Sequence, residues 1–435
     1  MKIQTDVKNE ESSAVLSISP NQYKGSDIER IQAAINAANG TTNKIVIPER
    51  NANGTYFWSV DRAILLPSNM TVVLDNCNIK LSDKCRDNMF RSNNVGLGIK
   101  EPVWNHNICI IGVGDVNLYG ADNPRATGDG TKELSLTPDE DRKKRGIYGI
   151  SYGTDAGKEG EQQTSDWRNI MILMAYVKRF YLKNVNIHYP HSWAVSFERT
   201  WNADIANIRF NNPGTRIING QNRRILNQDG IDLRQGCKNF RIDNISGHIE
   251  EDCIALSSLD CGEDSPHMIT PAKWYGSEDD TEQIFITNIK TGISGVAIRG
   301  TEKASIHNVY INGLTTELTR GVFMQEAYPT IYIGTGGYGK LSERGTIRDI
   351  FAMNISGAGT SLIHIDAPVE NCCFMNGILR SDGEIINYTD RVKGKSKNVV
   401  LKNMIKCPET VTRFDKTWCF FPEMVAENKT KGART

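Results

Sequence analysis

Residues 229–257 read DGIDLRQGCKNFRIDNISGHIEEDCIALS, and this stretch contains the pattern that decides the fold. It begins and ends with two similar hexapeptides, DGIDLR at 229–234 and DCIALS at 252–257, in which the third and fifth residues are apolar. Alternate residues of an extended strand point to the same side, so each hexapeptide predicts a strand with one buried face. The two hexapeptides start 23 residues apart. A repeat of this length is too short to bury a core by itself, so its copies must stack.

Four further hexapeptides with the same pattern occur on either side, at 193–198, 294–299, 320–325 and 361–366. In each of them the third and fifth residues are again apolar. Strands that repeat in this way predict a solenoid in which equivalent residues lie one above the other. We therefore expect the third residues of the six hexapeptides to form one inward stack: Val195, Ile231, Ile254, Val296, Val322 and Ile363.

Asparagine recurs in a second series of short segments such as LKNVNI, IANIRF and RIDNISG. The steps between these asparagines range from 20 to 46 residues, which we interpret as one coil or as one coil plus an insertion. Stacked asparagines at the turns of successive coils can bind one another by hydrogen bonds along the stack. The residues of this series are Asn184, Asn207, Asn244, Asn288, Asn308, Asn354, Asn376 and Asn403.

The fold class that these repeats predict is all-β, with a single parallel β-helix and an N-terminal capping helix. The helix is expected in GSDIERIQAAINAANG, where Ile28, Ile31 and Ile35 share one face and Gly40 ends the helix. We expect an N-terminal arm at 1–19, the β-helix at 20–406, and a C-terminal cap and tail at 407–435. Several β-sandwich domains are a weaker interpretation, because nothing between residues 30 and 400 resembles a linker.

Composition excludes some classes of function. Lys and Arg number 51 and so do Asp and Glu, so the chain lacks the cationic surplus of a sequence-independent nucleic-acid binder. No apolar run approaches the length that crosses a bilayer, and we expect neither nucleic acid nor membrane as a partner. The N-terminal sequence lacks a secretory pattern and the cysteines resemble buried thiols. A cytoplasmic location is expected, the alternative being a secreted or periplasmic protein whose signal has been removed.

Carboxylates gather where the two central hexapeptides stack. Neighbouring strands lie about 4.8 Å apart, so Asp229 and Asp252 stand one coil apart, with Asp232 and Glu251 beside them. Like charges at such distances cannot all ionise normally, and we expect one carboxyl to stay protonated at neutral pH. A protonated acid beside a carboxylate is the requirement of glycosidic hydrolysis. The alternative is that these are ordinary turn residues, with Arg234 as a neutralising partner.

The same residues resemble the polygalacturonase family, glycoside hydrolase family 28. NQDGID at 227–232 and EDCIAL at 251–256 are similar to that family's N-T-D-G-[IV]-D and G-D-D-C-I-A-[IV] motifs, and the similarity extends over about residues 20 to 405. The resemblance implies a right-handed parallel β-helix and an inverting hydrolase. It also implies Glu251 as the acid, with Asp229 and Asp252 activating water.

The chain departs from the family where the family binds the galacturonate carboxylate. The family's G-H-G coil is best matched by residues 293–298, which place Ser294 at the histidine position. Its R-I-K coil is matched by FMQ at 323–325, or by AIR at 297–299 in another register. The loss of these bases argues for a different glycan, so the expected substrate is a plant or microbial glycan, pectin-related or other.

A carbohydrate is therefore the expected partner, with no metal ion and no cofactor, and the oligomeric state is left open. Alternatives are a polysaccharide lyase, a fructan transferase, or a non-catalytic sugar-binding β-helix such as a tailspike or adhesin trunk. Insertions at about 153–168, 259–282 and 328–346 are expected to close one end of the groove and favour attack at chain ends. The expected substrate-binding residues are Asp232, Arg234, Glu198, Arg299, Gln325, His248 and Trp193.

Overall fold

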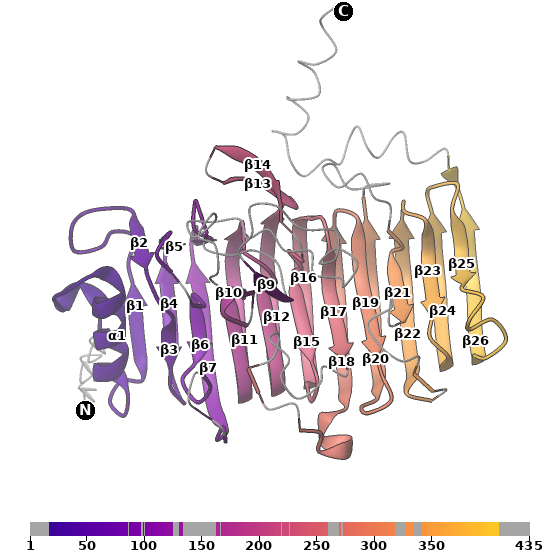
Figure 1. Cartoon of the computed structure of the whole chain (residues 1–435), viewed down its shortest axis with the longest axis horizontal. Coiled ribbons are helices and arrows are strands. Elements are labelled where there is room, and N and C mark those ends of the chain that lie inside the picture. The colour runs from indigo at the N-terminus through magenta and orange to yellow at the C-terminus, as the bar shows by residue number, and fades with distance from the viewer. Residues whose placement is uncertain are drawn as a thin grey trace, which may run out of the picture.

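The computed structural model describes residues 17–408 except for several gaps. The gaps are residues 86, 97–98, 100, 125–129, 134–161, 166, 219, 226, 260–268, 271–272, 318–327, 335–341 and 344. The described chain winds into one 22-stranded parallel sheet that is rolled into a β-helix, with successive coils side by side along a single long axis (Figure 1). This is the predicted fold class.

One face of the β-helix is a run of short parallel strands that we call the carboxylate sheet. Its neighbours pair in register from the N-terminal coils to the C-terminal coils. The strands are β3 (Ile64–Leu66), β6 (Phe90–Ser92), the first part of β11 (Ile172–His188), the first part of β12 (Val195–Asn212), β15 (Ile231–Arg234), β17 (Asp252–Ser258), β19 (Ser294–Gly300), β21 (Ile331–Gly334), β23 (Ser361–Asp366) and β25 (Glu384–Tyr388).

The longer strands that follow each corner form a second sheet, which includes the later parts of β11 and β12. Its other members are β1 (Lys44–Ile47), β4 (Thr71–Asp75), β7 (Asn105–Val113), β16 (Lys238–Ile249), β18 (Thr281–Thr291), β20 (Ile306–Thr316), β22 (Ile347–Gly357), β24 (Val369–Leu379) and β26 (Lys397–Lys406). A third, shorter run comprises β2 (Phe57–Val60), β5 (Asn78–Leu81) and β8 (Asn117–Tyr119).

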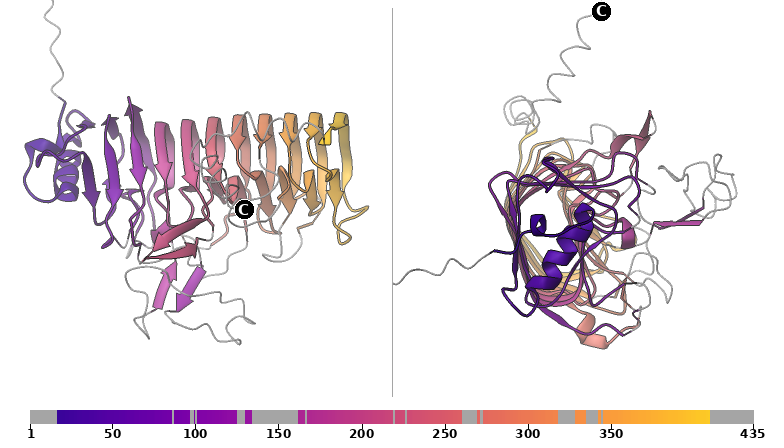
Figure 2. Two further views of the ribbon diagram at one scale, coloured as in Figure 1. Left: turned by 90° about the horizontal axis from the view of Figure 1, so that it is seen from above. Right: turned by 90° about the vertical axis from the view of Figure 1, so that its left-hand side faces the viewer.

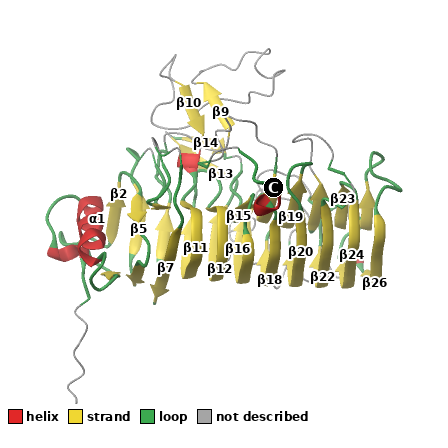
Figure 3. Cartoon of the chain, turned by 90° about the horizontal axis from the view of Figure 1, so that it is seen from below, coloured by secondary structure: helices red, strands yellow, loops and turns green. Residues whose placement is uncertain are grey.

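Two antiparallel hairpins project from one side of this body (Figures 2 and 3). They are β9 (Gly130–Glu133) with β10 (Gln162–Ser165), and β13 (Thr215–Ile218) with β14 (Gln221–Arg224). Short 3₁₀ turns occur at Pro20–Gln22, Trp167–Asn169 and Gly276–Asp279. No helix in the described residues has the length and apolar character needed to cross a membrane.

The inward stack forms as predicted, except at one coil. Val195, Ile231, Ile254 and Val296 pair in sequence across adjacent strands and all are fully buried. The next position is filled by Ile331, which pairs with Val296 on one side and Ile363 on the other, so the prediction of Val322 there is wrong. Both TIYIG and RGVFMQ alternate apolar residues, and this pattern alone does not decide which segment enters the sheet. The segment 320–325 itself lies outside the described residues.

The asparagine ladder is confirmed over several coils. Asn207 donates to the side chain of Asn184 at 2.7 Å, and Asn244 donates to Asn207 at 2.8 Å. All three have a positive φ, a backbone conformation that asparagine tolerates better than most residues. Asn308 was wrongly placed in this series: Gly313, at φ +79°, follows Asn288 in register. Glycine adopts a positive φ without a Cβ penalty, so the turn persists although the side chain is lost.

The two ends of the solenoid differ. The helix α1 (Asp27–Ala38) covers the N-terminal end with a buried face that includes Ile28, Ile31 and Ile35 (Figure 1). A capping box in which Glu29 accepts from the backbone N–H of Ser26 fixes the start of the helix. At the opposite end the inward-facing Leu401 of β26 is 39% exposed.

Candidate active site

Asp229 lies just before β15, and Asp252 begins β17, the neighbouring strand in the carboxylate sheet. The pairing of Ile231 with Ile254 places the two aspartates opposite each other, and the N–H of Gly230 donates to the Asp252 carbonyl at 2.9 Å. Gly230 permits this close approach, because a Cβ at that position would lie 2.5 Å from the Cys253 carbonyl oxygen. The predicted juxtaposition of the two motifs is therefore present in the structure.

The carboxyl of Asp229 is in an unfavourable place for a negative charge. Burial raises its pKa well above the ordinary value, and the carboxylates of Asp232, Asp252 and Glu251 raise it further. The guanidinium of Arg299 offsets part of this effect. The crowding expected from the sequence thus acts most clearly on Asp229, whose carboxyl favours the protonated form.

Asp252 differs from Asp229 in that its carboxyl has a cation and a hydroxyl as direct partners. Its Oδ2 lies 2.5 Å from the Nη1 of Arg299, and its Oδ1 accepts a hydrogen bond from the Ser294 hydroxyl at 2.8 Å. Arg299 comes from the next coil, where the short side chains of Ala255 and Ala297 occupy the position between it and Asp252. A guanidinium and a hydroxyl stabilise the ionised form of a carboxylate. The site therefore combines a carboxyl that favours its proton with a second carboxyl that is paired to a guanidinium and a hydroxyl.

Glu251 lies immediately before β17 and is only partly buried. Its neighbour Glu250 is completely buried and lies 2.8 Å from the Nε2 of His248, which is also buried. His248, near the end of β16, therefore pairs with Glu250 in the turn that leads to β17. We assign it a role in holding this turn, in place of the substrate contact that was expected from the sequence.

Four further residues on the expected binding list are buried: Glu198, Trp193, Arg234 and Asp232. Glu198 is fully buried and accepts the N–H groups of Ile269 and Thr270 at 3.0 and 2.9 Å, so it fixes that loop. Trp193 packs in a cluster that includes Trp167 and Leu173, and the guanidinium carbon of Arg234 lies 4.8 Å from its ring centre.

Glu198, Trp193 and Arg234 are therefore held by contacts within the protein and are not on the open surface. Asp232 faces Ser196 and Ala255 in register and is buried next to Asp229. Gln325 lies outside the described residues. About half of the residues in the three insertions expected to close the groove also lie outside them, and residues 331–334 of the third insertion form strand β21 of the sheet.

On the C-terminal side of Arg299 the face continues as an aromatic surface. The ring of Tyr332 lies 5.4 Å from the Arg299 guanidinium carbon and stacks on the His364 ring at 5.2 Å with 12° between the planes. The hydroxyl of Tyr332 donates to Asp366 at 3.0 Å. Burial lowers the pKa of His364, so this ring is neutral at neutral pH. Half-buried rings of this kind present apolar area to a sugar.

In the described part of the chain, no three histidine, cysteine, aspartate or glutamate side chains are arranged as metal ligands.

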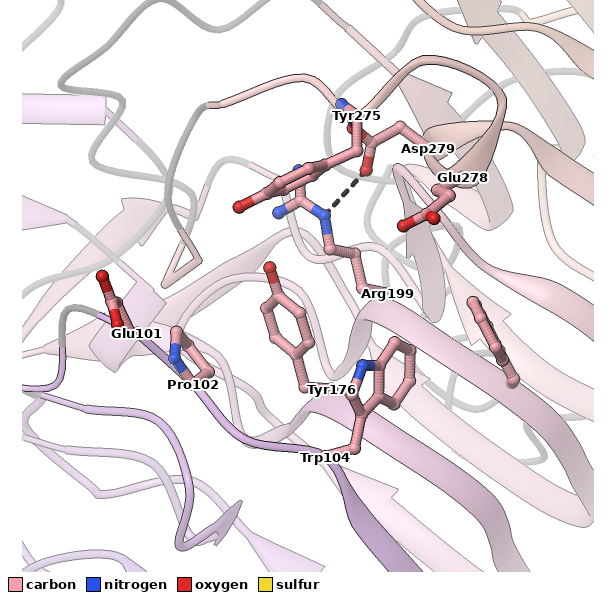
Figure 4. Close-up of a pocket in the computed structure, with 9 residues that line it drawn as sticks. Glu101, Pro102, Trp104, Tyr176, Arg199, Tyr275, Glu278 and Asp279 are labelled. Carbon is pink, nitrogen blue, oxygen red and sulfur yellow. Dashed lines mark hydrogen bonds and ion pairs between the residues drawn. The ribbon is translucent and has the colours of Figure 1, made fainter.

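A separate pocket, of about 350 Å³, lies at the corner where the carboxylate sheet turns into the second sheet (Figure 4). Its lining includes Trp104, Tyr176, Trp201 and Tyr275. The hexapeptide pattern did not reveal this pocket, because its residues come from corners and from the loop before β18. The only signal in the sequence was the presence of aromatic residues close to these corners.

Comparisons with known proteins agree on the fold. No family model matches the chain, and no curated protein matches it significantly. A polygalacturonase from Erwinia carotovora ssp. carotovora is similar in structure, with a TM-score of 0.53 and 14% identity over 90% of this chain and 94% of that chain. A tailspike protein mutant of E. coli bacteriophage HK620 has a TM-score of 0.53 and 11% identity over 90% of this chain and 66% of that chain. At these identities the likeness shows a shared parallel β-helix fold.

Proposed function

We propose that the protein hydrolyses glycosidic bonds of a polysaccharide or oligosaccharide, with Asp229, Glu251 and Asp252 as its catalytic carboxylates. The observation that carries the proposal is the contrast between Asp229 and Asp252. Burial and neighbouring carboxylates raise the pKa of Asp229, which favours its protonated form, whereas Asp252 is paired with Arg299 and Ser294 one coil away. A protonated carboxyl close to further carboxylates is what acid–base hydrolysis of a glycosidic bond requires. The polygalacturonase among the structural neighbours is consistent with this activity.

The surroundings of the carboxyls favour Asp229 as the proton donor to the leaving oxygen. Asp252 or the more exposed Glu251 then activates water. The motif resemblance implies the reverse order, with Glu251 as the acid and Asp229 in the base pair. The two assignments predict that different variants, Asp229→Asn or Glu251→Gln, will behave as the variant that lacks the acid. Loss of the acid matters least for substrates whose leaving group is itself acidic, because such a group departs without a proton.

The expected substrate is neutral rather than a polyuronate. A uronate needs a cation with donors available to it, and in this site Arg299 is engaged by Asp252 and Arg234 packs on Trp193. Ser294 donates to Asp252 and stands where the family has histidine. We therefore expect pectic acids to be poorer substrates than neutral glycans.

The test is a screen of neutral and pectic oligosaccharides, with NMR observation of the anomer released. We expect a product of inverted configuration, and a fall in activity of about 10²–10⁴ for Asp229→Asn. Glu251→Gln and Asp252→Asn are compared in the same assay. An aryl glycoside of the same sugar then identifies the acid, because only the acid variant retains substantial activity on it. Full activity in any two of the three variants would refute a catalytic role.

A non-catalytic sugar-binding β-helix is the second candidate. The ion pair of Asp252 with Arg299 favours it, because that carboxylate already has partners within the protein. The tailspike neighbour shows that this fold also occurs in a tailspike protein of a bacteriophage. Saturable binding of a glycan, with no product formed from any member of the screen, would support this candidate over the hydrolase.

A further inference from the structure

We propose that the corner pocket binds one unit of a neutral saccharide and forms a second sugar site apart from the carboxylates. The proposal rests on the glycan specificity of the proposed function. The pocket volume, about 350 Å³, is within the range of small-molecule sites. Figure 4 shows Tyr275 and Arg199 on one side of the space and Tyr176 and Trp104 on the other.

The register of the coils explains why these side chains meet. Asn105, Val177 and Thr200 pair across three successive coils, so Trp104, Tyr176 and Arg199 precede them at the same corner. Tyr176 and Arg199 both have a positive φ, at 50° and 42°, which turns the chain from one sheet into the other. Each coil therefore supplies one large side chain to the same corner, and the stack of corners forms the pocket wall.

Four of the nine residues that line the pocket are aromatic. The ring centres of Trp104 and Tyr176 lie 5.2 Å apart in an edge-to-face arrangement, and those of Trp104 and Trp201 lie 4.5 Å apart. Tyr275, from the loop before β18, is 42% exposed and overhangs Arg199 (Figure 4). Burial raises the pKa of Tyr176 to about 12, so its hydroxyl remains neutral. Apolar ring area with nearby hydroxyls suits the CH faces and hydroxyl groups of a sugar.

A cationic ligand is disfavoured because protein cations already lie against the rings. The ammonium of Lys178 is 4.7 Å from the Trp104 ring centre and 4.3 Å from that of Trp201. The guanidinium carbon of Arg199 is 5.6 Å from the Tyr176 centre and 5.2 Å from the Tyr275 centre. A ligand cation would be repelled by these charges at close range.

An anionic ligand is disfavoured by the carboxylates. Glu101 and Glu278 are exposed at the pocket, and the buried Asp279 accepts from the Nε of Arg199 at 2.7 Å. Arg199 also donates to the Thr270 hydroxyl at 2.8 Å and to the Lys273 carbonyl at 2.7 Å. Its donors are thus directed to the protein, and the lining has more acidic than basic groups. A neutral ligand with hydroxyls to donate to Glu101 and Glu278 fits both constraints.

Close packing and hydrogen bonds hold the pocket wall and link it to the carboxylate sheet. Gly236 packs against Arg199, where a Cβ would lie 2.8 Å from the Arg199 Cγ. Thr270 contacts Arg199 through its hydroxyl and Glu198 through its backbone N–H, so one loop holds both residues. Arg199 aligns with Gln235, six residues after Asp229, which places the pocket roughly 20 Å along the strand direction from the carboxylates. One extended oligosaccharide can reach both places.

The experiment measures binding by tryptophan fluorescence and calorimetry in an Asp229→Asn/Asp252→Asn background, so that no probe is cleaved. The probes are cellohexaose, maltohexaose, mannohexaose and xylohexaose, with hexagalacturonate and choline as charged comparisons. We expect at least one neutral hexasaccharide to bind. Tyr275→Ser and Trp104→Ala should each weaken that binding by about tenfold. The matched control is Tyr310→Ser, which removes a tyrosine of similar exposure, 39%, from the second sheet and should leave affinity unchanged.

Three outcomes would overturn the proposal: no neutral probe binds, neutral binding is insensitive to both pocket variants, or hexagalacturonate or choline binds in their place. The proposed hydrolysis fails separately. With intact carboxylates, Tyr275→Ser should raise KM for long substrates and leave kcat unchanged. Pocket-dependent binding without any cleavage would retain this second site and reject the hydrolase. If Tyr275→Ser changes neither the cleavage of long substrates nor the binding of neutral probes, the hydrolase is retained and the second sugar site is rejected.

Discussion

At the scale of single residues, the site is built from carboxyl groups that the fold forces together. The Asp229 carboxyl is buried and lies opposite Asp252, and Asp232 follows it three residues later in the same coil. Asp366, on β23 of the same sheet, illustrates the opposite case. Burial raises its pKa, but hydrogen bonds from Arg391, Thr389 and Tyr332 outweigh burial and leave the pKa below the ordinary value. The two aspartates therefore predict opposite effects of pH on stability.

Replacement of Asp229 by asparagine should stabilise the fold at neutral pH. Because the pKa of Asp229 is raised on folding, its contribution to stability is fully present below the ordinary aspartate pKa of about 3.9. That contribution is lost as the pH rises through the folded-state pKa. Asparagine does not ionise, so the free energy of unfolding of Asp229→Asn should exceed that of the wild type increasingly as the pH rises. Urea unfolding over a pH series measures this difference.

Asp366→Asn is the control with the opposite sign. Its lowered pKa contributes stability above about pH 3.9, and that contribution disappears as the pH falls through the folded-state value. This variant should therefore be less stable than the wild type at neutral pH and should approach it in acid. If both variants shift stability in the same direction at neutral pH, the charge environment assigned to Asp229 is wrong.

The ion pair of Arg299 with Asp252 gives a second prediction at this scale. Arg299→Gln leaves the Asp252 carboxylate, whose side chain is 11% exposed, without its main charge partner. We expect a loss of about 2 kcal/mol in the free energy of unfolding, below the 3–5 kcal/mol of fully buried pairs. The double variant Arg299→Gln/Asp252→Asn should recover most of this loss, because no unpaired charge remains. Additive losses in the double variant would contradict the coupling.

At the scale of secondary-structure elements, the turns are as regular as the strands. Asn207 has φ +59°, donates to Asn184 and accepts from Asn244. Its side chain thus joins three coils, while its backbone takes a conformation that most residues avoid. These two contributions to turn stability can be separated by substitution.

Asn207→Gly should be less harmful than Asn207→Ala. Both variants lose two exposed hydrogen bonds, worth about 0.5 kcal/mol each at such a site. Alanine additionally has to adopt a positive φ, so we expect it to lower the free energy of unfolding by about 1 kcal/mol more than glycine does. Chemical denaturation of the two variants measures the difference. Equal losses would show that the backbone conformation contributes nothing.

The strand pattern in the sequence predicts most of the carboxylate sheet, because stacked coils repeat with the period-2 alternation of a strand. It fails between Val296 and Ile363, where two segments alternate equally well and only Ile331 enters the stack. Asn308 was misplaced for a related reason, since glycine can take the turn position that asparagine usually fills. A pattern of residue types shows that a repeat is present. Where two segments fit the pattern, packing decides which of them enters the sheet.

The candidate site likewise has one part that the sequence predicts and another part that it does not. The approach of Asp229 to Asp252 follows from the register of two hexapeptides and was predicted. The contact of Arg299 with Asp252 crosses from one coil to another over short side chains, and no spacing in the sequence indicates it. Likewise, the burial of Glu198 and Trp193 is caused by loops whose paths the repeat does not determine.

At the scale of the whole molecule, a solenoid has two ends at which its core is exposed. Helix α1 covers the first end and buries an entire apolar face there. At the second end, no strand among the described residues pairs with β26 on its outer side. Phe374 is fully buried, whereas Leu401, which pairs with it one coil later, is 39% exposed. An open edge strand with apolar neighbours is a site for association between molecules.

The chain continues past β26 with residues 409–435, which include the apolar stretch TWCFFPEM at 417–424. We expect this segment to cover the open end, in keeping with the C-terminal cap expected from the sequence. A chain shortened to residue 408 should then associate end to end in sedimentation experiments, and amide exchange in β24 and β26 should accelerate. Leu401→Lys in the shortened chain should restore the monomer, because the added charge opposes edge-to-edge pairing. A shortened chain that stays monomeric, with unchanged exchange in β26, would show that the segment does not act as a cap.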